Sequence, residues 1–468
     1  MSASPVCLLL LSTLTACAVG PDYQAPAAQS PERWLAADSS VIQNATREML
    51  KNWWVIFADN ELNHLLDRAM SGNFDLKIAL ARIDQARAGL GSAQAARQPG
   101  LGLDSGVQRN QNPFPGLAPG LRYNQFQLGF DAVWELDLFG GLQRRAESAE
   151  ADLAASREQY RQARLILTAE LARDYVEYRN LQQQLRINRA YLQAQQQNLF
   201  LTEKLLEAGV ATRADWLRSR SQTDDTAARI PDLEAQLAVL LSQLEVLTGD
   251  QPGVLAVELN EPVDIPLAHG QALLLSPAET LRGRPDIRTV ERRLASATAL
   301  QGAAMAELYP KLSLSAFLGM RNTDLESLFK SAAFSYTTAA GLLQPALNFG
   351  KIRAAINSAE SRQQQAYLEY EKAVMTALQE TETAITGYLK AEIRRKTLAD
   401  SVTNLQESLT ISQRRMQQGV ASRLDVLDAE RNLYTAQAEL AQSAAKSATQ
   451  LIAVYKALGG SATDDLGG

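Results

Sequence analysis

The chain has 468 residues, of which 46% are hydrophobic and only 6% aromatic, and its formal net charge is −6. This acidic balance argues against a nucleic-acid partner. The two histidines, His64 and His269, lie far apart, and the sequence contains no Gly-rich phosphate loop and no nucleophile elbow. We therefore expect no enzyme activity, no cofactor and no metal site.

The first residues predict secretion and lipid attachment. Residues 1–16 carry no charged side chain and include an apolar stretch that is too short to span a bilayer permanently. The stretch ends in Leu14-Thr15-Ala16-Cys17, which resembles a bacterial lipobox, so we expect cleavage after residue 16 and a palmitate-bearing lipid on Cys17. The alternative is an ordinary signal peptide with an incidental cysteine. Because Ala18 rather than aspartate follows the cysteine, the outer membrane is favoured over the inner one.

The rest of the chain repeats itself at an offset of about two hundred residues. Phe139-Gly140 opens a long polar helical segment, and Phe349-Gly350 does the same. The turn Gly209-Val210-Ala211 recurs as Gly419-Val420-Ala421. Each half predicts a helix, a short strand pair, a very long helix, a tight turn and a helix. We interpret this order as an internal tandem duplication.

The predicted segments follow one another along the chain without overlap. They are a signal peptide over 1–16, a lipidated N-terminal segment over 17–58, a first-half periplasmic helix over 59–98, a first strand pair over 99–139, a first long helix and tip hairpin over 140–249, a linker or equatorial region over 250–276, a second-half periplasmic helix over 277–308, a second strand pair over 309–349, a second long helix and tip hairpin over 350–458, and a C-terminal tail over 459–468.

The predicted strands alternate apolar and polar residues, as strands with two different faces do. In the clearest of them, from Tyr123 to Leu136, the apolar set includes Phe126, Leu128, Phe130 and Trp134. In the second half, the corresponding set begins with Leu312 and Leu314. Strands of about ten residues with aromatic residues near one end match those of outer-membrane barrels. The alternative is a sandwich whose polar face meets water.

Four strands cannot close into a barrel, because a barrel needs about eight or more. Open strand edges are not tolerated in lipid. If these strands cross a membrane, several chains must therefore share one barrel. Closure permits two chains, which would give a barrel filled by side chains, or three or four, which would leave a lumen.

The predicted helices after each strand pair are too long for one globular domain. Residues 140–208 and 350–418 lack an interior proline, and at 1.5 Å per residue each would extend about 100 Å. Apolar residues recur every seven positions from Leu171 onward, and a second seam begins at Ile230, as in coiled coils. Pro231 lies at the start of that seam and is expected to break or kink its helix.

Each long helix is followed by a tight turn with helix-capping residues. In the first turn, Gly209 fits the position after a helix end, Thr212 can cap the next helix, and Asp215 follows three residues later. The second turn repeats this order with Gly419, Ser422 and Asp425, and then adds Asp428. Carboxylates at these positions stabilise helix N-termini. They would also ring a channel mouth if the hairpins converge on an axis.

Taken together, the motifs resemble the TolC-type outer membrane efflux protein family, and specifically its lipoprotein branch, the OprM/NodT-like group. The resemblance extends from Cys17 to about Leu458 and is carried by Cys17-Ala18-Val19-Gly20-Pro21-Asp22-Tyr23, Trp53-Trp54-Val55-Ile56-Phe57-Ala58-Asp59, Ala79-Leu80-Ala81-Arg82-Ile83-Asp84-Gln85-Ala86-Arg87, Asp131-Ala132-Val133-Trp134-Glu135-Leu136-Asp137-Leu138-Phe139-Gly140, Arg284-Pro285-Asp286-Ile287-Arg288 and Leu308-Tyr309-Pro310-Lys311-Leu312-Ser313-Leu314. One departure is Leu347-Asn348, where many relatives have a Phe-Asp pair.

The resemblance implies a mixed α/β membrane protein that assembles as a homotrimer. Three sets of four strands would make a twelve-stranded β-barrel in the outer membrane of a Gram-negative bacterium, continued by a long α-helical barrel in the periplasm. The family works as the exit duct of tripartite pumps, together with a periplasmic adaptor (membrane fusion) protein and an inner-membrane transporter, here of the resistance-nodulation-division type. The cargo would be drugs or other small molecules. A type I protein secretion channel and a periplasmic structural adaptor are the alternatives.

The resemblance also assigns roles to residues of the hairpins. The periplasmic gate of relatives matches Asp425 and Asp428, while Asp215 matches a carboxylate of the first hairpin. Arg213 and Arg423 are candidate partners of these carboxylates. The small apolar turns suit docking of an adaptor through Gly209, Val210, Ala211, Gly419, Val420 and Ala421.

The alternating strands predict which residues face lipid. We expect outer membrane lipid to contact the apolar strand face formed by Phe126, Leu128, Phe130, Trp134, Leu312 and Leu314.

Overall fold

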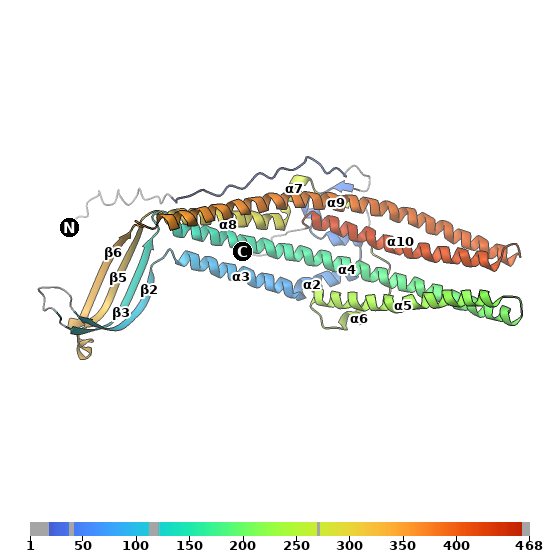
Figure 1. Ribbon diagram of the computed structural model, residues 1–468, viewed down its shortest axis with the longest axis horizontal. Coiled ribbons are helices and arrows are strands. Elements are labelled where there is room, and N and C mark those ends of the chain that lie inside the picture. Colours follow the sequence, from blue (N-terminus) through green and yellow to red (C-terminus); the bar gives the residue numbers. More distant parts are fainter. Residues whose placement is uncertain (1–17, 37–41, 112–119, 121, 269–271, 461–468) are drawn as a thin grey trace. The chain divides into compact units, whose positions relative to one another are not determined.

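The computed structural model describes residues 18–36, 42–111, 120, 122–268 and 272–460 (Figure 1). The predicted signal peptide, Cys17 and the end of the predicted tail lie outside the described residues. The chain forms two compact units. The sheet unit comprises Met1–Ala27, Ala81–Arg157 and Thr289–Glu371, and the hairpin unit comprises Ala28–Leu80, Glu158–Arg288 and Lys372–Gly468.

The sheet unit contains a four-stranded antiparallel sheet with the strand order β2-β3-β5-β6 (Figure 1). Its strands are β2 (Gly100–Gln111), β3 (Arg122–Leu136), β5 (Lys311–Asn322) and β6 (Phe334–Leu343). Each predicted strand pair forms antiparallel partners, and β3 joins the two halves by pairing with β5. The outer strands β2 and β6 are consequently the edges of this sheet.

The register confirms that the predicted apolar residues of the strands share one face. Phe130 lies opposite Leu103 on β2 and opposite Leu318 on β5. Trp134 lies opposite Leu314. Because side chains alternate along a strand, the residues two positions before and after each of these lie on the same face.

Long helices connect the sheet to two hairpins. The chain contains α2 (Asn60–Gly72), α3 (Phe74–Ala95), α4 (Gly141–Glu207), α5 (Arg213–Thr248), α6 (Val254–Glu258), α7 (Pro277–Gly283), α8 (Pro285–Ala306), α9 (Phe349–Gln417) and α10 (Arg423–Ala457). The very long helices are confirmed, with 67 residues in α4 and 69 in α9. In the described part of the chain, no helix is both long enough and apolar enough to cross a membrane.

Of the break or kink expected at Pro231, the break was wrong, because α5 continues through this residue. Proline in a helix interior costs about 3 kcal/mol or more. Contacts on both sides of Pro231 offset that cost: before it, the Thr226 hydroxyl donates to the Gln195 amide oxygen of α4 at 3.0 Å, and after it, Leu237 and Leu241 pack against the hydrophobic core.

The two halves contain the same elements in the same order. The first half runs α3, β2, β3, α4 and α5, and the second runs α8, β5, β6, α9 and α10. Several short elements had no counterpart in the predictions. Among them, β1 (Ile42–Asn44) pairs in parallel with β4 (Ala272–Leu274).

One hydrophobic core joins both hairpins within the hairpin unit. Trp53 is almost fully buried, and its ring stacks on Tyr455 of α10 with centroids 5.5 Å apart. The core also takes in apolar side chains of α2, α4, α5 and α9, including Leu62, Leu171 and Leu244. The Trp-Trp motif therefore holds the bases of the hairpins together.

Candidate functional site

The first hairpin turn, between α4 and α5, is built from residues with local conformational roles. Gly209 has a φ of +72°, a left-handed conformation that glycine adopts without steric cost. The Thr212 hydroxyl accepts a hydrogen bond from the Asp215 backbone N–H at 3.2 Å, and the Asp215 carboxylate accepts one from the Thr212 N–H at 3.0 Å. The predicted capping box is therefore confirmed. Hydrogen bonds from the hydroxyl and backbone of Thr212 lower the pKa of Asp215.

The second hairpin turn, between α9 and α10, has the same local chemistry. Gly419 has a φ of +75°. Ser422 and Asp425 form a capping box, with the Ser422 N–H 2.8 Å from the carboxylate. Hydrogen bonds from the backbone and hydroxyl of Ser422 lower the pKa of Asp425. One turn later, Asp428 pairs with Arg431 at 3.1 Å.

Both turns present apolar side chains to solvent. Val210 is 74% exposed and Val420 is 61% exposed. Leu217 and Leu424, just inside the following helices, are also exposed. The residues predicted for adaptor docking are thus accessible in the chain.

The interior of the first hairpin is polar. Gln195 and Asn198 of α4 and Ser219, Thr223 and Thr226 of α5 are all buried. The Thr226 hydroxyl donates to the Gln195 amide oxygen at 3.0 Å, and the Asn198 amide donates to the Ser219 hydroxyl at 3.4 Å. Toward the turn, hydrogen bonds therefore take the place of apolar packing between these two helices, whereas their other ends contribute to the hydrophobic core.

The interior of the second hairpin is apolar. Leu409 of α9 and Val426 and Leu433 of α10 form a buried cluster, joined by the partly buried side chains of Val402, Leu405, Met416 and Ala429. This hairpin is therefore packed like a coiled coil.

Beyond the shared core, α4 and α10 also contact each other nearer the turns. Arg423 Nε donates to the Asn198 amide oxygen at 3.4 Å, so the buried amide of the first hairpin also contacts the second. Nearer the base, the Tyr191 and Tyr434 rings pack with centroids 4.7 Å apart. We call this pair of contacts the hairpin seam. Asn198, Tyr191 and Tyr434 were not among the predicted site residues, because each contact joins residues that are far apart in the sequence.

Within the described residues of one chain, neither Arg213 nor Arg423 pairs with the hairpin carboxylates that were expected to be their partners. Arg423 reaches the first hairpin rather than a carboxylate. Arg213 lies over the Trp216 ring at 4.1 Å, while Asp215 pairs with Arg218 at 3.7 Å. Pairing of Arg213 or Arg423 with carboxylates of another chain stays a prediction.

Cys17 lies outside the described residues, but the residues after it have defined contacts in the sheet unit. The Val19 N–H donates to the Phe139 carbonyl at 3.1 Å. Arg144 of α4 donates to the Val19 carbonyl and pairs with Asp22 at 2.6 Å. The N-terminal segment is therefore fixed where β3 leads into α4.

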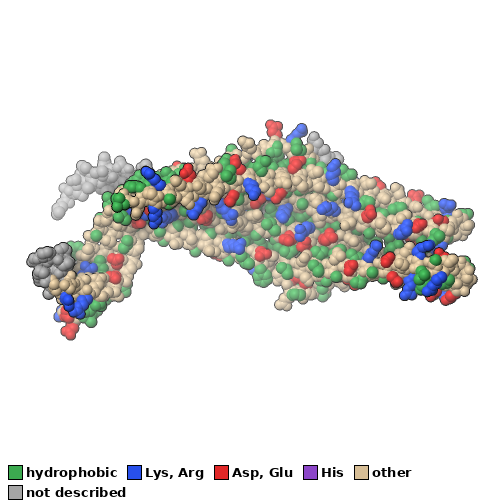
Figure 2. All heavy atoms as spheres, in the orientation of Figure 1, with side chains coloured by type: hydrophobic (Ala, Val, Ile, Leu, Met, Phe, Trp, Pro, Cys, Tyr) green, Lys and Arg blue, Asp and Glu red, His purple; other side chains and the backbone are tan. Residues whose placement is uncertain are grey.

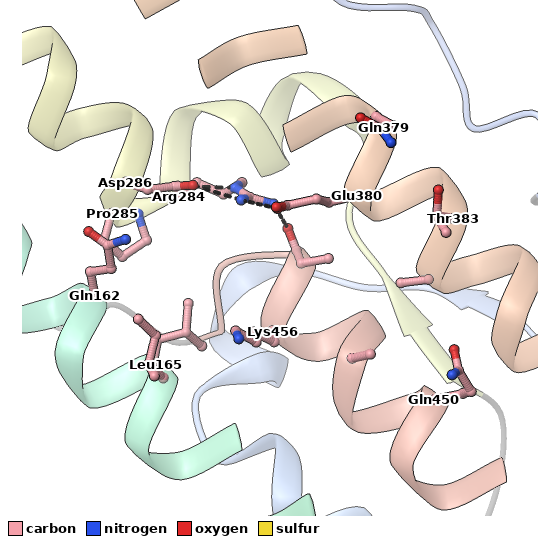
Figure 3. A pocket seen from close by; sticks show the side chains of 14 residues that line it. Gln162, Leu165, Arg284, Pro285, Asp286, Gln379, Glu380, Thr383, Gln450 and Lys456 are labelled. Carbon is pink, nitrogen blue, oxygen red and sulfur yellow. Dashed lines mark hydrogen bonds and ion pairs between the residues drawn. The ribbon is translucent and has the colours of Figure 1, made fainter. Parts of the chain in front are cut away.

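A cavity of about 520 Å³ lies in the hairpin unit beside the Arg284-Pro285-Asp286 motif (Figure 3). Arg284 pairs with Asp286 and Glu380 at 2.7 Å each and donates to the Ala457 carbonyl at 2.8 Å. The guanidinium thus connects the start of α8 with α9 and the end of α10. Because it is committed to these contacts, the motif has a structural role here.

The sequence over residues 65–250 and 277–460 matches the family model described as outer membrane efflux protein. The chain belongs to the outer membrane efflux protein family. The predicted family is confirmed, and the family is one of efflux channels rather than enzymes.

Relatives of known role cover nearly the full chain. The solvent efflux pump outer membrane protein SrpC of Pseudomonas putida is 30% identical over 97% of this chain and 97% of its own length. Nodulation protein T of Rhizobium leguminosarum bv. trifolii is 30% identical over 92% of this chain and 91% of its own length. The solved structure of the outer-membrane channel OprN has a TM-score of 0.87 and 33% identity, covering 95% of this chain and 99% of that one. The chain is therefore the outer-membrane exit duct of an efflux system.

Proposed function

We propose that three copies of the chain form one channel, which passes small molecules from an inner-membrane pump through the outer membrane. The observation that carries this proposal is the sheet: one face is mostly apolar along its whole length, and among the described residues the outer edges of β2 and β6 pair with no strand. Water could satisfy such edges, but lipid could not.

The height of the apolar face matches a membrane. It extends from the row of Leu136, Leu312 and Leu342 to the row of Val107 and Phe126. Phe126 and Leu136 are ten residues apart on β3. At about 3.4 Å per residue this is about 34 Å along the strand, and about 26 Å once the strand is tilted by about 40°. The apolar band of outer-membrane barrels is about 25 Å tall.

The edges supply the reason for more than one copy. If β6 of one chain pairs with β2 of the next, three chains make a closed barrel of about twelve strands with a water-filled lumen. The polar face would then line the lumen. It carries the Gln127 amide, which donates to the Asp104 carboxylate, and the Arg321 guanidinium, which lies 4.6 Å from the Phe317 ring centre.

The hairpins supply a gate. In a trimer, Asp215, Asp425 and Asp428 would be repeated around the mouth, and a ring of carboxylates favours cations. The hairpin seam would hold the closed arrangement, because Arg423 and Asn198 connect the two hairpins. Arg213 and Arg423 would offset part of the carboxylate charge across chain boundaries.

The exposed turns supply a docking surface for a periplasmic adaptor. Val210 and Val420 are apolar and accessible, and the flanking Gly209, Ala211, Gly419 and Ala421 allow close approach of another backbone. The transporter beyond the adaptor would be of the resistance-nodulation-division type. Relatives named for solvent and toluene efflux support small hydrophobic molecules as the cargo. A lipid on Cys17 would anchor the N-terminal segment, whose residues Val19 and Asp22 contact Arg144 near the start of α4.

Paired substitutions on one strand test the channel. Phe130→Arg places a charge near the middle of the apolar face and should cost about 2–4 kcal/mol of barrel stability. Gln127→Arg on the polar face is the matched control and should be tolerated. We expect heat-resistant trimers and ion conductance in planar bilayers from the wild type and Gln127→Arg, and few trimers from Phe130→Arg. Equal trimer yield from both variants would contradict membrane insertion of this face.

A further inference from the structure

Two exposed arginines extend the apolar face of the sheet at one end. In the β2–β3 register, Arg109 lies opposite Asn124, and Gln111 lies opposite Arg122. These residues share the face of Val107 and Phe126, because each is an even number of positions away on its own strand. Figure 2 shows basic side chains at this end of the sheet.

The position of the two arginines follows from strand geometry. Arg109 is two residues beyond Val107, and Arg122 is four residues beyond Phe126. At about 3.4 Å per residue they lie about 7 and 14 Å past the last apolar row, measured along the strands. If the apolar rows cross the hydrocarbon layer, this is the depth of lipid headgroups. The inference therefore rests on the proposed channel function.

Most N–H donors of the Arg109 and Arg122 guanidinium groups make no hydrogen bond among the described residues. Arg122 Nε donates to the Gln111 amide oxygen at a long 3.4 Å. Within the described ranges of the chain, no carboxylate pairs with Arg109 or Arg122. A guanidinium has five N–H donors arranged to match a phosphate, so most of them are open to a ligand.

We propose that Arg109 and Arg122 bind the phosphate groups of lipid headgroups that surround the barrel. Charge complementarity and continuity with the apolar face favour a lipid: the acyl chains would contact Val107 and Phe126 while the phosphate meets the arginines. The strand ends formed by residues 109–111 and 122–124 lie away from the strand ends that lead into the helices, so the lipid belongs to the outward leaflet. The ligand class is a phosphorylated glycolipid of the lipid A type.

The opposite face of the same sheet provides a matched control. Arg321 of β5 lies opposite Gln127 of β3, on the polar face. Its guanidinium is held over the Phe317 ring. Replacing Arg321 removes the same charge from the same sheet but leaves the lipid-facing side unchanged.

The experiment measures lipid binding to the purified trimer in a phosphate-free maltoside detergent. Diphosphoryl lipid A, monophosphoryl lipid A and a phosphate-free galactolipid are added separately, and binding is followed by native mass spectrometry and by the melting temperature of the trimer. An arginine near an anionic headgroup contributes about a fivefold change in affinity. Arg109→Gln with Arg122→Gln should therefore weaken diphosphoryl lipid A binding about 25-fold. Arg321→Gln should bind like the wild type, and the galactolipid should bind weakly to all three.

Two outcomes would overturn the proposal. The first is equal lipid A affinity of the double variant and the wild type. The second is that millimolar inorganic phosphate displaces lipid A from the wild type, and that the double variant loses phosphate binding to the same extent as lipid A binding. That result would indicate a site for a free anion instead of a lipid. Conductance of the same preparations separates this inference from the channel itself. A conducting trimer with unchanged lipid binding contradicts only the headgroup site, whereas a protein that neither trimerises nor conducts contradicts the channel.

Discussion

The two hairpins share their turn chemistry but differ in what fills them. Both turn at a left-handed glycine and restart with a capping box. Between the helices, the first hairpin buries Gln195 and Thr226, whereas Leu405 and Ala436 occupy the matching places in the second. The two halves therefore share the local signals of the turn and differ in the interior of the hairpin.

This difference has a consequence for how the hairpins separate. Apolar packing is lost outright when two helices part, because buried hydrocarbon becomes exposed to water. Hydrogen bonds between side chains can be replaced by hydrogen bonds to water, so the net contribution of each is only about 0.5–1.5 kcal/mol. We expect the second hairpin to move as one rigid coiled coil. The hydrogen bonds inside the first hairpin and at the hairpin seam should break and re-form during the movement.

The largest effect is expected from a matched pair in the two interiors. Leu433 and Thr223 are buried at equivalent places after the two turns. Leu433→Ala removes apolar packing and should cost about 2–5 kcal/mol. Thr223→Ala should cost about 1 kcal/mol, since the Thr223 hydroxyl only bonds the Ser219 carbonyl of its own helix.

Hydrogen exchange of each hairpin in the trimer measures both variants. Leu433→Ala should open α9 and α10 far more than Thr223→Ala opens α4 and α5. Similar opening in the two hairpins would mean that the polar and apolar interiors contribute equally to hairpin stability.

A second prediction concerns the hairpin seam. Asn198→Ala removes the acceptor of the Arg423 hydrogen bond and the donor to the Ser219 hydroxyl. A hydrogen bond to a charged group contributes about 1.5–3 kcal/mol of stability, and partial exposure to solvent reduces that contribution here. We expect a larger open fraction in single-channel recordings. Gln195→Ala is the control, because Gln195 bonds Thr226 within the first hairpin. If both variants show the same open fraction, the seam does not hold the closed state.

A third prediction concerns the carboxylates of the second hairpin. Asp425→Ala combined with Asp428→Ala should raise single-channel conductance, weaken the cation preference and sensitise cells to large antibiotics such as vancomycin. Asp215→Ala is the comparison in the first hairpin and should change conductance less, because one carboxylate rather than two is lost from each chain. Trimer melting is recorded on the same samples. A lower melting temperature with unchanged conductance would assign the carboxylates to helix capping alone.

The smallest effect is expected from pH. The pKa values of Asp215 and Asp425 are lowered by their capping bonds, so each carboxylate stabilises its helix above the ordinary carboxyl range. That contribution is lost as the pH falls below about 4 and through the lowered pKa. Proteolysis at the two turns should therefore increase on acidification, and Ser422→Ala should flatten the response of the second turn only. If proteolysis at the second turn still increases fully on acidification in Ser422→Ala, the capping role of Asp425 would be contradicted.

Features that depend only on neighbouring residues could be predicted from the amino-acid sequence. Glycine at the turns, Thr212 and Ser422 as caps, the alternation of Phe126 to Leu136 and the length of α4 and α9 were all readable, because turns, caps and periodicity are set within a few residues. Alternation also gave the clearer strands an apolar side, but the strand register was needed to join these sides into one face.

Contacts between distant segments could not be predicted in this way and became visible in the folded chain. The tertiary structure paired β3 with β5, placed β1 beside β4, stacked Trp53 on Tyr455 and carried α5 through Pro231. It also turned Arg423 toward Asn198, a contact between residues 225 positions apart. No local rule specifies such a partner, because many side chains could accept that hydrogen bond and the packing of whole helices selects one. Helix packing also determines whether the interior of each hairpin is polar or apolar. The nearly identical turn sequences do not predict this difference.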